Sequence, residues 1–197
     1  MGLSNGNSSN GKFVTIVNGK WTLRVPEGTD GASPRVLEKG PNTGTTVWEK
    51  YYDHIDGALV SAHIKHGQFG ADLCLNISDD AEYTVQIPVD SQYFSVFGKV
   101  APNLDPTASI FLGLGYDKEK GRTFMYVKQD GQTVHSAFTK DNPNGMPPPE
   151  QKMVKGVKKW DFEDQENFLY SKVEDFIALL GGEAPPAPAE EEDDVPF

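Results

Sequence analysis

Cationic and aromatic side chains alternate along one stretch of the chain whose other positions are mostly apolar. The first set consists of Arg122, Phe124, Tyr126 and Lys128, and the second of Thr123, Met125 and Val127. Successive side chains of a β-strand point to opposite faces, so each set would occupy one face. The second set suits a hydrophobic core. The first suits unpaired nucleotides, because rings stack on bases and cations meet phosphates, at about 1–3 kcal/mol per stacked base.

A second stretch repeats this pattern less regularly. Its alternate positions are Trp48, Lys50, Tyr52 and His54, and the opposite face is a mediocre core of Val47, Glu49, Tyr51, Asp53 and Ile55. We expect bases to stack on Phe124, Tyr126, Trp48 and Tyr52, with phosphates at Arg122, Lys128 and Lys50. The alternative is a structural role, which aromatic residues in β proteins commonly have. Trp21 shares its face with Leu23 and Val25, and we expect it in the core.

Two further groups of cations accompany these stretches. Lys152, Lys155, Lys158 and Lys159 precede Trp160. They either extend a phosphate-binding track or receive an acidic segment, or they belong to a solvated linker. Lys118 and Lys120 sit with Arg122 at an expected hairpin tip, from which they could close over a bound strand.

The C-terminus is the most specific feature of the sequence. Five consecutive acids, Glu190 to Asp194, are followed by Val195, Pro196 and Phe197. Such an end can bind a partner protein: the Phe197 ring would fill an apolar pocket of the partner, its carboxylate would meet a cation there, and the acids would steer the segment to basic surfaces. The simpler interpretation is a solubilising acidic tail.

This tip resembles the end of bacterial single-stranded DNA-binding proteins, which close an acidic segment with Ile-Pro-Phe or a close variant. Asp193, Asp194, Val195, Pro196 and Phe197 match it nearly position for position. The layout of the body, a β domain followed by one helix and a short spacer, is nearer to the phage counterparts. The resemblance implies an oligonucleotide-binding (OB) barrel that holds single-stranded DNA. It also implies a tip that docks replication or recombination enzymes such as a polymerase, helicase or primase.

Charge is divided unevenly along the 197 residues. Residues 1–160 hold 17 Lys and Arg against 17 Asp and Glu, and residues 161–197 hold one Lys against 12 acids. The net charge of −11 therefore belongs to the last segment, and a neutral body remains compatible with nucleic acid. Cys74 is a single cysteine, no apolar run could span a bilayer, and the polar start lacks a signal core. We expect a cytoplasmic protein, in the bacterial host if phage-encoded, and leave self-association open.

No arrangement in the sequence indicates catalysis, a cofactor or a metal. His63 and His66 have no third ligand nearby, and Gly113-Leu114-Gly115 lies in a strand pattern without the helix of a dinucleotide motif. We therefore expect a binding protein and not an enzyme. Two alternatives predict other classes: a phage structural or decoration protein with a β-sandwich body, and an enzyme of nucleic-acid metabolism that carries the same tip.

The elements that must position these side chains are mostly strands. We expect strands at 13–17 and 20–25 around the turn Asn18-Gly19, at 47–55 and 58–65 around Asp56-Gly57, and at 72–77, 83–89, 92–100, 109–116, 122–128 and 132–138. Residues 26–46 form a long loop and 141–150 a linker. One amphipathic helix covers 161–180, with acids at its start and Gly181-Gly182 at its end.

The pattern predicts a mainly β fold, an OB-fold-like antiparallel barrel with elaborated loops and one C-terminal helix. Residues 12–180 would form the DNA-binding domain. Residues 1–11 would be a disordered N-terminus and 181–197 a disordered, acidic, partner-docking tail.

Overall fold

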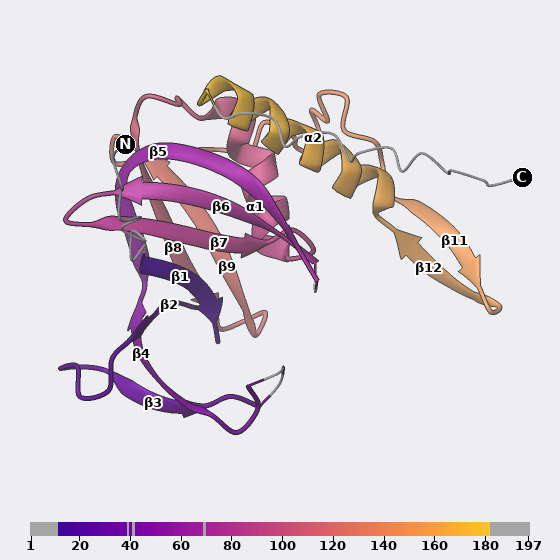
Figure 1. Ribbon diagram of the computed structural model, residues 1–197. Coiled ribbons are helices and arrows are strands. Elements are labelled where there is room, and N and C mark those ends of the chain that lie inside the picture. Colours follow the sequence, from indigo (N-terminus) through magenta and orange to yellow (C-terminus); the bar gives the residue numbers. More distant parts are fainter. Residues whose placement is uncertain (1–11, 39, 41, 69, 182–197) are drawn as a thin grey trace, which may run out of the picture.

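The computed structural model describes residues 12–38, 40, 42–68 and 70–181, and its architecture is mainly β (Figure 1). Ten strands of the described part form one sheet in the order β10-β9-β8-β5-β6-β7-β1-β2-β4-β3, and β11 and β12 form a separate pair. The strands are β1 (Lys12–Val17), β2 (Lys20–Val25), β3 (Ser33–Val36), β4 (Thr46–Tyr52), β5 (His54–Gly67), β6 (Gly70–Ser78), β7 (Glu82–Pro88), β8 (Ser109–Asp117), β9 (Arg122–Gln129), β10 (Gln132–Thr133), β11 (Glu150–Val154) and β12 (Val157–Asp161). The helices are α1 (Gln92–Val100), a 3-10 turn (Ala101–Asn103) and α2 (Glu163–Leu179).

The sheet is not closed into a barrel, so the expected barrel is wrong while the mainly β class is confirmed. After β2 the chain extends the sheet through β4 and β3, which lie below the body in Figure 1, and β3 and β10 remain separate edges. Two hydrogen bonds bring β2 and the β4–β5 junction to β8: Trp21 Nε1 donates to the Leu112 carbonyl at 2.9 Å, and Leu114 N donates to the Asp53 carbonyl at 2.8 Å. The sheet is also not wholly antiparallel, because β1 and β7 pair in parallel.

Both helices contribute to the core of the sheet. Helix α1 contacts β7 and β9, and α2 packs on α1. The Phe97 and Phe176 rings meet edge to face with centroids 5.8 Å apart, and both side chains are buried. Trp21 is also fully buried, as expected from its face. Helix α2 agrees with the predicted helix at 161–180, including its end at Gly181, which has the left-handed φ of +73°.

Residues 92–100 form α1 and not the expected strand. The Ser91 hydroxyl accepts a hydrogen bond from Phe94 N at 3.2 Å, which is an N-cap. The buried residues Phe94, Phe97 and Val100 are spaced by three, so the apolar pattern follows the helical period.

Asp56-Gly57 is not a turn, contrary to the prediction. The chain bends at Asp53, and β5 then runs through these residues to Gly67. Gly57 serves close approach, since a Cβ there would lie 2.6 Å from the Ser78 carbonyl oxygen. Other local predictions hold: β1 and β2 turn at Asn18-Gly19, both with positive φ, and β8 and β9 match the expected strands. The expected strand at 132–138 is reduced to β10, β3 lies in the expected loop, and the hairpin β11–β12 was not predicted.

Candidate nucleic-acid interface

The alternating face of β9 lies on the outside of the sheet. Met125 and Val127 point into the core, whereas Phe124 is 44% exposed and Tyr126 is half-buried. The register with β8 sets Gly113 opposite Tyr126 and Gly115 opposite Phe124. Directly opposite residues of an antiparallel pair share a face. The sequence therefore placed Arg122, Phe124, Tyr126 and Lys128 correctly on one surface.

The two rings of β9 pack over the two glycines of β8 and occupy the space that a Cβ would fill. A Cβ at Gly115 would lie 2.5 Å from Phe124 Cζ, and a Cβ at Gly113 would lie 2.6 Å from Tyr126 Oη. Such distances show that the rings lean across onto the backbone of β8 instead of standing upright beside it. Each ring therefore has one side against the glycine backbone, and its other side is turned away from the sheet.

Two further rings extend this surface across β8 and β5. The His54 and Phe111 rings stack with centroids 4.7 Å apart and planes inclined by 16°. Phe111 lies 5.9 Å from Tyr126, and Tyr126 lies 6.2 Å from Phe124. We call His54, Phe111, Tyr126 and Phe124 the aromatic row. It crosses three neighbouring strands of the sheet.

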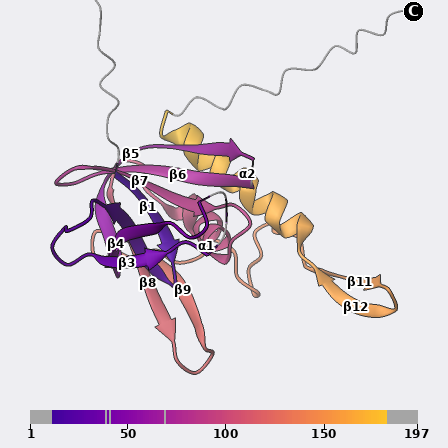
Figure 2. The same cartoon turned by 60° about the horizontal axis from the view of Figure 1, so that its bottom comes forward.

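A cation lies at the aromatic row. Lys128 Nζ is 5.4 Å from the centroid of Phe111 and 5.5 Å from that of Tyr126, distances typical of cation–π contacts. Arg122 lies at the other end of β9, where the turn to β8 begins. The turn itself carries Lys118 and Lys120, and projects from the body in Figure 2. Asp117 accepts hydrogen bonds from Lys120 N and Glu119 N, which lower the pKa of its carboxyl group.

The second predicted set is divided by the structure. Trp48, Lys50 and Tyr52 pair with Val25, Leu23 and Trp21 of β2, so they share a face with two buried core residues and one that is half-buried. Tyr52 is 43% exposed and lines a cavity of about 290 Å³ together with His54, which connects it to the aromatic row. Trp48 is four residues away, about 13 Å along β4. It lines a different groove with Arg24 and Val25.

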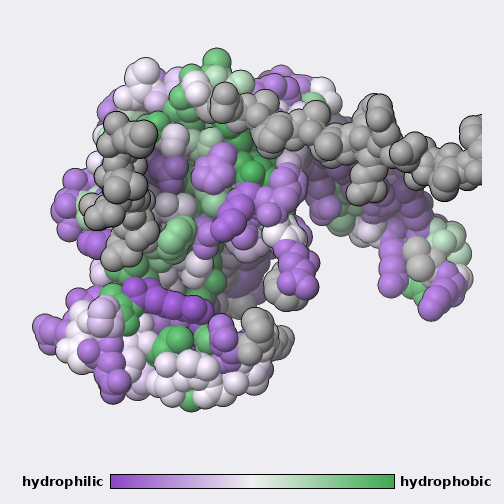
Figure 3. Space-filling model, viewed as in Figure 1, coloured by the Kyte–Doolittle hydropathy of each residue, from purple (hydrophilic) through white to green (hydrophobic). Residues whose placement is uncertain are grey.

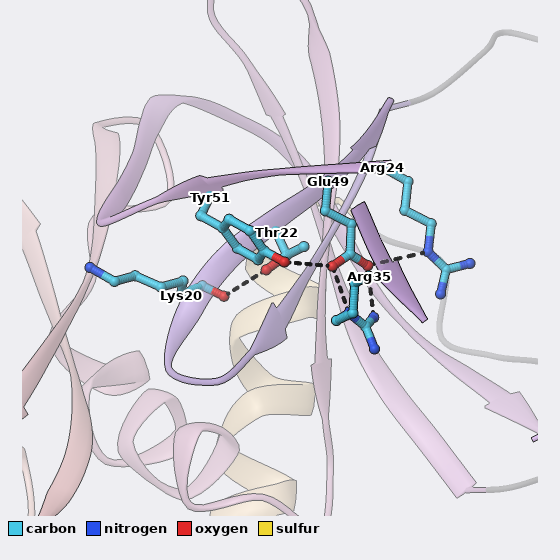
Figure 4. A network of polar contacts seen from close by, with 6 residues as sticks. All are labelled: Lys20, Thr22, Arg24, Arg35, Glu49 and Tyr51. Atoms are coloured by element: carbon cyan, nitrogen blue, oxygen red, sulfur yellow. Dashed lines mark hydrogen bonds and ion pairs between the residues drawn. The ribbon is translucent and has the colours of Figure 1, made fainter. Parts of the chain in front are cut away.

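The opposite face of β4 is ionic, where the sequence indicated only a mediocre core (Figure 4). The fully buried Glu49 accepts hydrogen bonds from Arg35 Nε and Nη2, both at 2.7 Å, and from Tyr51 Oη at 3.0 Å. Arg24 Nε lies 3.8 Å from the same carboxylate. The Arg35 hydrogen bonds lower the pKa of Glu49 despite its burial. This network ties β3 to β4 and so fixes the strand that carries Tyr52.

The cavity beside His54 has an acidic rim. Asp56, Asp79 and Asp80 line it. Tyr83 Oη donates to Asp80 Oδ1 at 2.7 Å, which together with burial raises the pKa of Tyr83 to about 12. The acidic rim thus lies at the His54 end of the aromatic row. Lys128 lies beside Phe111 and Tyr126, in the middle of the row, and Arg122 lies beyond Phe124 at the start of β9. Phosphates are attracted to these cations and repelled by the rim.

Phe111, His54 and the two glycines were not among the predicted site residues. Phe111, Gly113 and Gly115 alternate in the expected strand 109–116, which is the signal that could have found them. The predicted docking residues Asp193, Asp194, Val195, Pro196 and Phe197 lie outside the described residues. Within the described part there is no cluster of three or more metal-ligating side chains and no helix that could cross a membrane. No family model, curated protein or solved structure matches this chain.

Proposed function

We propose that this protein binds single-stranded DNA without strong sequence preference, and that the aromatic row is its base-stacking surface. The seating of Phe124 and Tyr126 over glycines carries this proposal. An apolar core has no use for rings on the outside of a sheet, whereas a row of accessible rings suits bases of any identity. The proposal assigns no catalytic step and no cofactor to the chain.

Cations complete the surface. Lys128 and Arg122 on β9, and Lys118 and Lys120 at the β8–β9 turn, can each meet a phosphate. Four such contacts on a single strand correspond to a slope of log K against log salt of about −3. The acidic rim near His54 repels phosphates from that end of the row, and Lys128 beside Phe111 and Tyr126 and Arg122 beyond Phe124 attract them.

The C-terminal tip gives the second half of the proposal. Its match to the tips of single-stranded DNA-binding proteins supports docking of replication or recombination enzymes through Asp193 to Phe197. An OB-fold relationship belongs to the same proposal, since a curved and partly open sheet occurs in that fold. Removal of Glu190 to Phe197 should tighten DNA binding, because the acids no longer compete with phosphates, and should abolish enzyme recruitment.

Fluorescence anisotropy with labelled oligo(dT) at two salt concentrations tests the binding surface. Phe124→Ala should weaken binding about 5- to 150-fold, which is the stacking contribution of one base. Phe13→Ala is the matched control, because Phe13 is 54% exposed but lies on β1, away from the row. A phage structural or decoration protein would instead show no affinity for oligonucleotides and would self-associate without DNA. That result would overturn the proposal.

A further inference from the structure

The hairpin β11–β12 projects from the N-terminal end of α2, away from the main sheet (Figures 1 and 2). Its strands pair only with each other among the described residues. A lone two-stranded hairpin is at best marginally stable in water. The turn Lys155-Gly156, with φ of 52° and 80°, has the left-handed geometry of a tight two-residue loop. Asp161 closes the base, pairing with Lys152 and accepting a hydrogen bond from Glu163 N at 3.0 Å.

One face of the hairpin carries a ring and a cation. The register sets Gln151 opposite Trp160 and Met153 opposite Lys158, so all four share a face. Trp160 is 58% exposed and Met153 is 64% exposed. Aromatic and cationic side chains are thus interleaved on an exposed β surface here as they are on β9. Figure 3 shows hydrophilic and apolar surface next to each other on this hairpin.

The other face places two like charges together. Lys152 is directly opposite Lys159. Like charges in this position destabilise a strand pair, and a bound anion would relieve the repulsion. Asp161 pairs with Lys152, whereas Lys159 has no carboxylate within 4.0 Å among the described residues. Among the described residues, Lys159 therefore remains open to an anionic ligand.

Local charge favours a nucleic acid over an apolar protein segment as the ligand. Residues 150–161 hold four Lys against Glu150 and Asp161. The adjoining α2 holds five acids against Lys172, so the positive charge is confined to the hairpin. An apolar partner that covered Trp160 and Met153 would also cover Lys158 on the same face, at a desolvation cost. A DNA strand offers that lysine a phosphate and the indole a base.

We infer that the hairpin is a second contact for single-stranded DNA, in which Trp160 stacks on a base, Lys158 on the same face binds a phosphate, and Lys159 on the opposite face adds electrostatic attraction for the strand. This inference rests on the proposed function and extends it: a strand long enough to leave the aromatic row is also held at the hairpin. The two contacts are linked through the body of the protein, so binding to the second becomes intramolecular and raises the affinity for long strands.

A length series of oligo(dT) tests this on the full-length protein. An oligonucleotide of about 8 nucleotides covers the aromatic row alone, and one of about 30 reaches further. Trp160→Ala and the double variant Lys158→Ala/Lys159→Ala should each weaken binding of the long strand about 5- to 150-fold and leave the short strand unchanged. Trp160→Phe should retain most of the long-strand affinity, because it retains a ring. Leu179→Ala is the matched control, an exposed apolar residue at the other end of α2.

Intrinsic fluorescence gives an independent measurement. Stacking on Trp160 should quench a component of the emission that Trp160→Phe lacks, whereas Trp21 is fully buried and cannot stack on a base. An unchanged thermal midpoint in the hairpin variants would show that they fold, since the hairpin lies outside the core.

The possible failures are distinguishable. If the hairpin variants bind long strands as the parent does while Phe124→Ala is weakened, the inference is wrong and the proposed function stands. If Phe124→Ala, Tyr126→Ala and the hairpin variants all bind as the parent does, both are wrong. If Trp160→Ala changes sedimentation without DNA but not DNA affinity, the hairpin is an interface between copies and the inference is overturned.

Discussion

Gly113→Ala is the substitution that tests the aromatic row most directly, because it changes no residue that would touch DNA. The added Cβ would lie 2.6 Å from Tyr126 Oη, and closer still to the ring atom Cζ. Tyr126 is a half-buried side chain at the surface, so its ring can lift away without a shift of the backbone. The Tyr126 ring then moves off the Gly113 backbone, and the flat surface on which a base would stack is lost.

The expected effects on stability and on binding differ in size. Replacing a strand glycine by alanine gains about 0.5–1 kcal/mol, which offsets the about 0.5–1.5 kcal/mol of ring contacts that are lost. The free energy of unfolding should therefore change by less than about 1 kcal/mol. One stacked base contributes about 1–3 kcal/mol, so affinity for oligo(dT) should fall about 5- to 150-fold.

Urea unfolding and oligo(dT) anisotropy of the same preparation measure the two quantities. Gly67→Ala is the control, because among the described residues its Cβ would meet the Gly70 carbonyl oxygen alone, at 3.5 Å, an ordinary contact, on a strand end away from the row. The reasoning is refuted if Gly113→Ala binds DNA as tightly as the parent. It is refuted equally if DNA affinity and stability fall together, since the ring would then be a structural element.

The remaining predictions concern phosphate binding, the buried Glu49 carboxylate and the packing of helix α2. Lys128→Ala should reduce the steepness of log K against log salt by about 0.7, measured by anisotropy over a salt series; an unchanged slope would remove this lysine from the phosphate contacts. Arg35→Ala should lower the free energy of unfolding in urea by about 2–4 kcal/mol, because it leaves the buried Glu49 carboxylate without its main partner. This value is reduced from that of a fully buried pair because Arg35 is 28% exposed. The pKa of Glu49 is lowered by Arg35, so this carboxylate stabilises the fold fully above its unfolded value of about 4.3, and the contribution is lost as pH falls through the lower folded value. Glu49→Gln should flatten that acid limb of stability against pH, and an unaltered limb would contradict the assignment. Phe176→Ala should cost about 3–5 kcal/mol in a single cooperative transition, because its ring packs on Phe97; a separate early transition of α2 would show that the helix is not part of the domain.

Local patterns predicted the parts of the fold that depend on near neighbours in the chain. Asn18-Gly19 turns because both residues take positive φ, and α2 carries acids in its first turn and ends at a glycine. The strand prediction for residues 92–100 failed because nine residues are compatible with both the strand and the helix period. The Ser91 cap and burial against α2 selected the helix. The turn prediction at Asp56-Gly57 failed because Gly57 allows the close approach of Ser78, which is distant in sequence.

The candidate site divides in the same way. Alternation along β9 was enough to separate Phe124 and Tyr126 from Met125 and Val127, because side-chain direction in a strand follows from the backbone alone. Phe111 and His54 joined them only through strand register, which brings together residues 13 to 72 positions apart in the sequence. Trp48 shows the limit of the pattern: it has the same alternation, yet β4 runs away from the aromatic row.

Composition, local periodicity and turn chemistry were enough to predict the charge division, the outward face of β9, the hairpins β1–β2 and β8–β9 and the last helix. The folded structure alone revealed that the sheet stays open, that two rings lie over Gly113 and Gly115, and that Glu49 is buried with Arg35. These features depend on which strands become neighbours. Pairing is a cooperative outcome of packing the whole core, and no short window of sequence contains it.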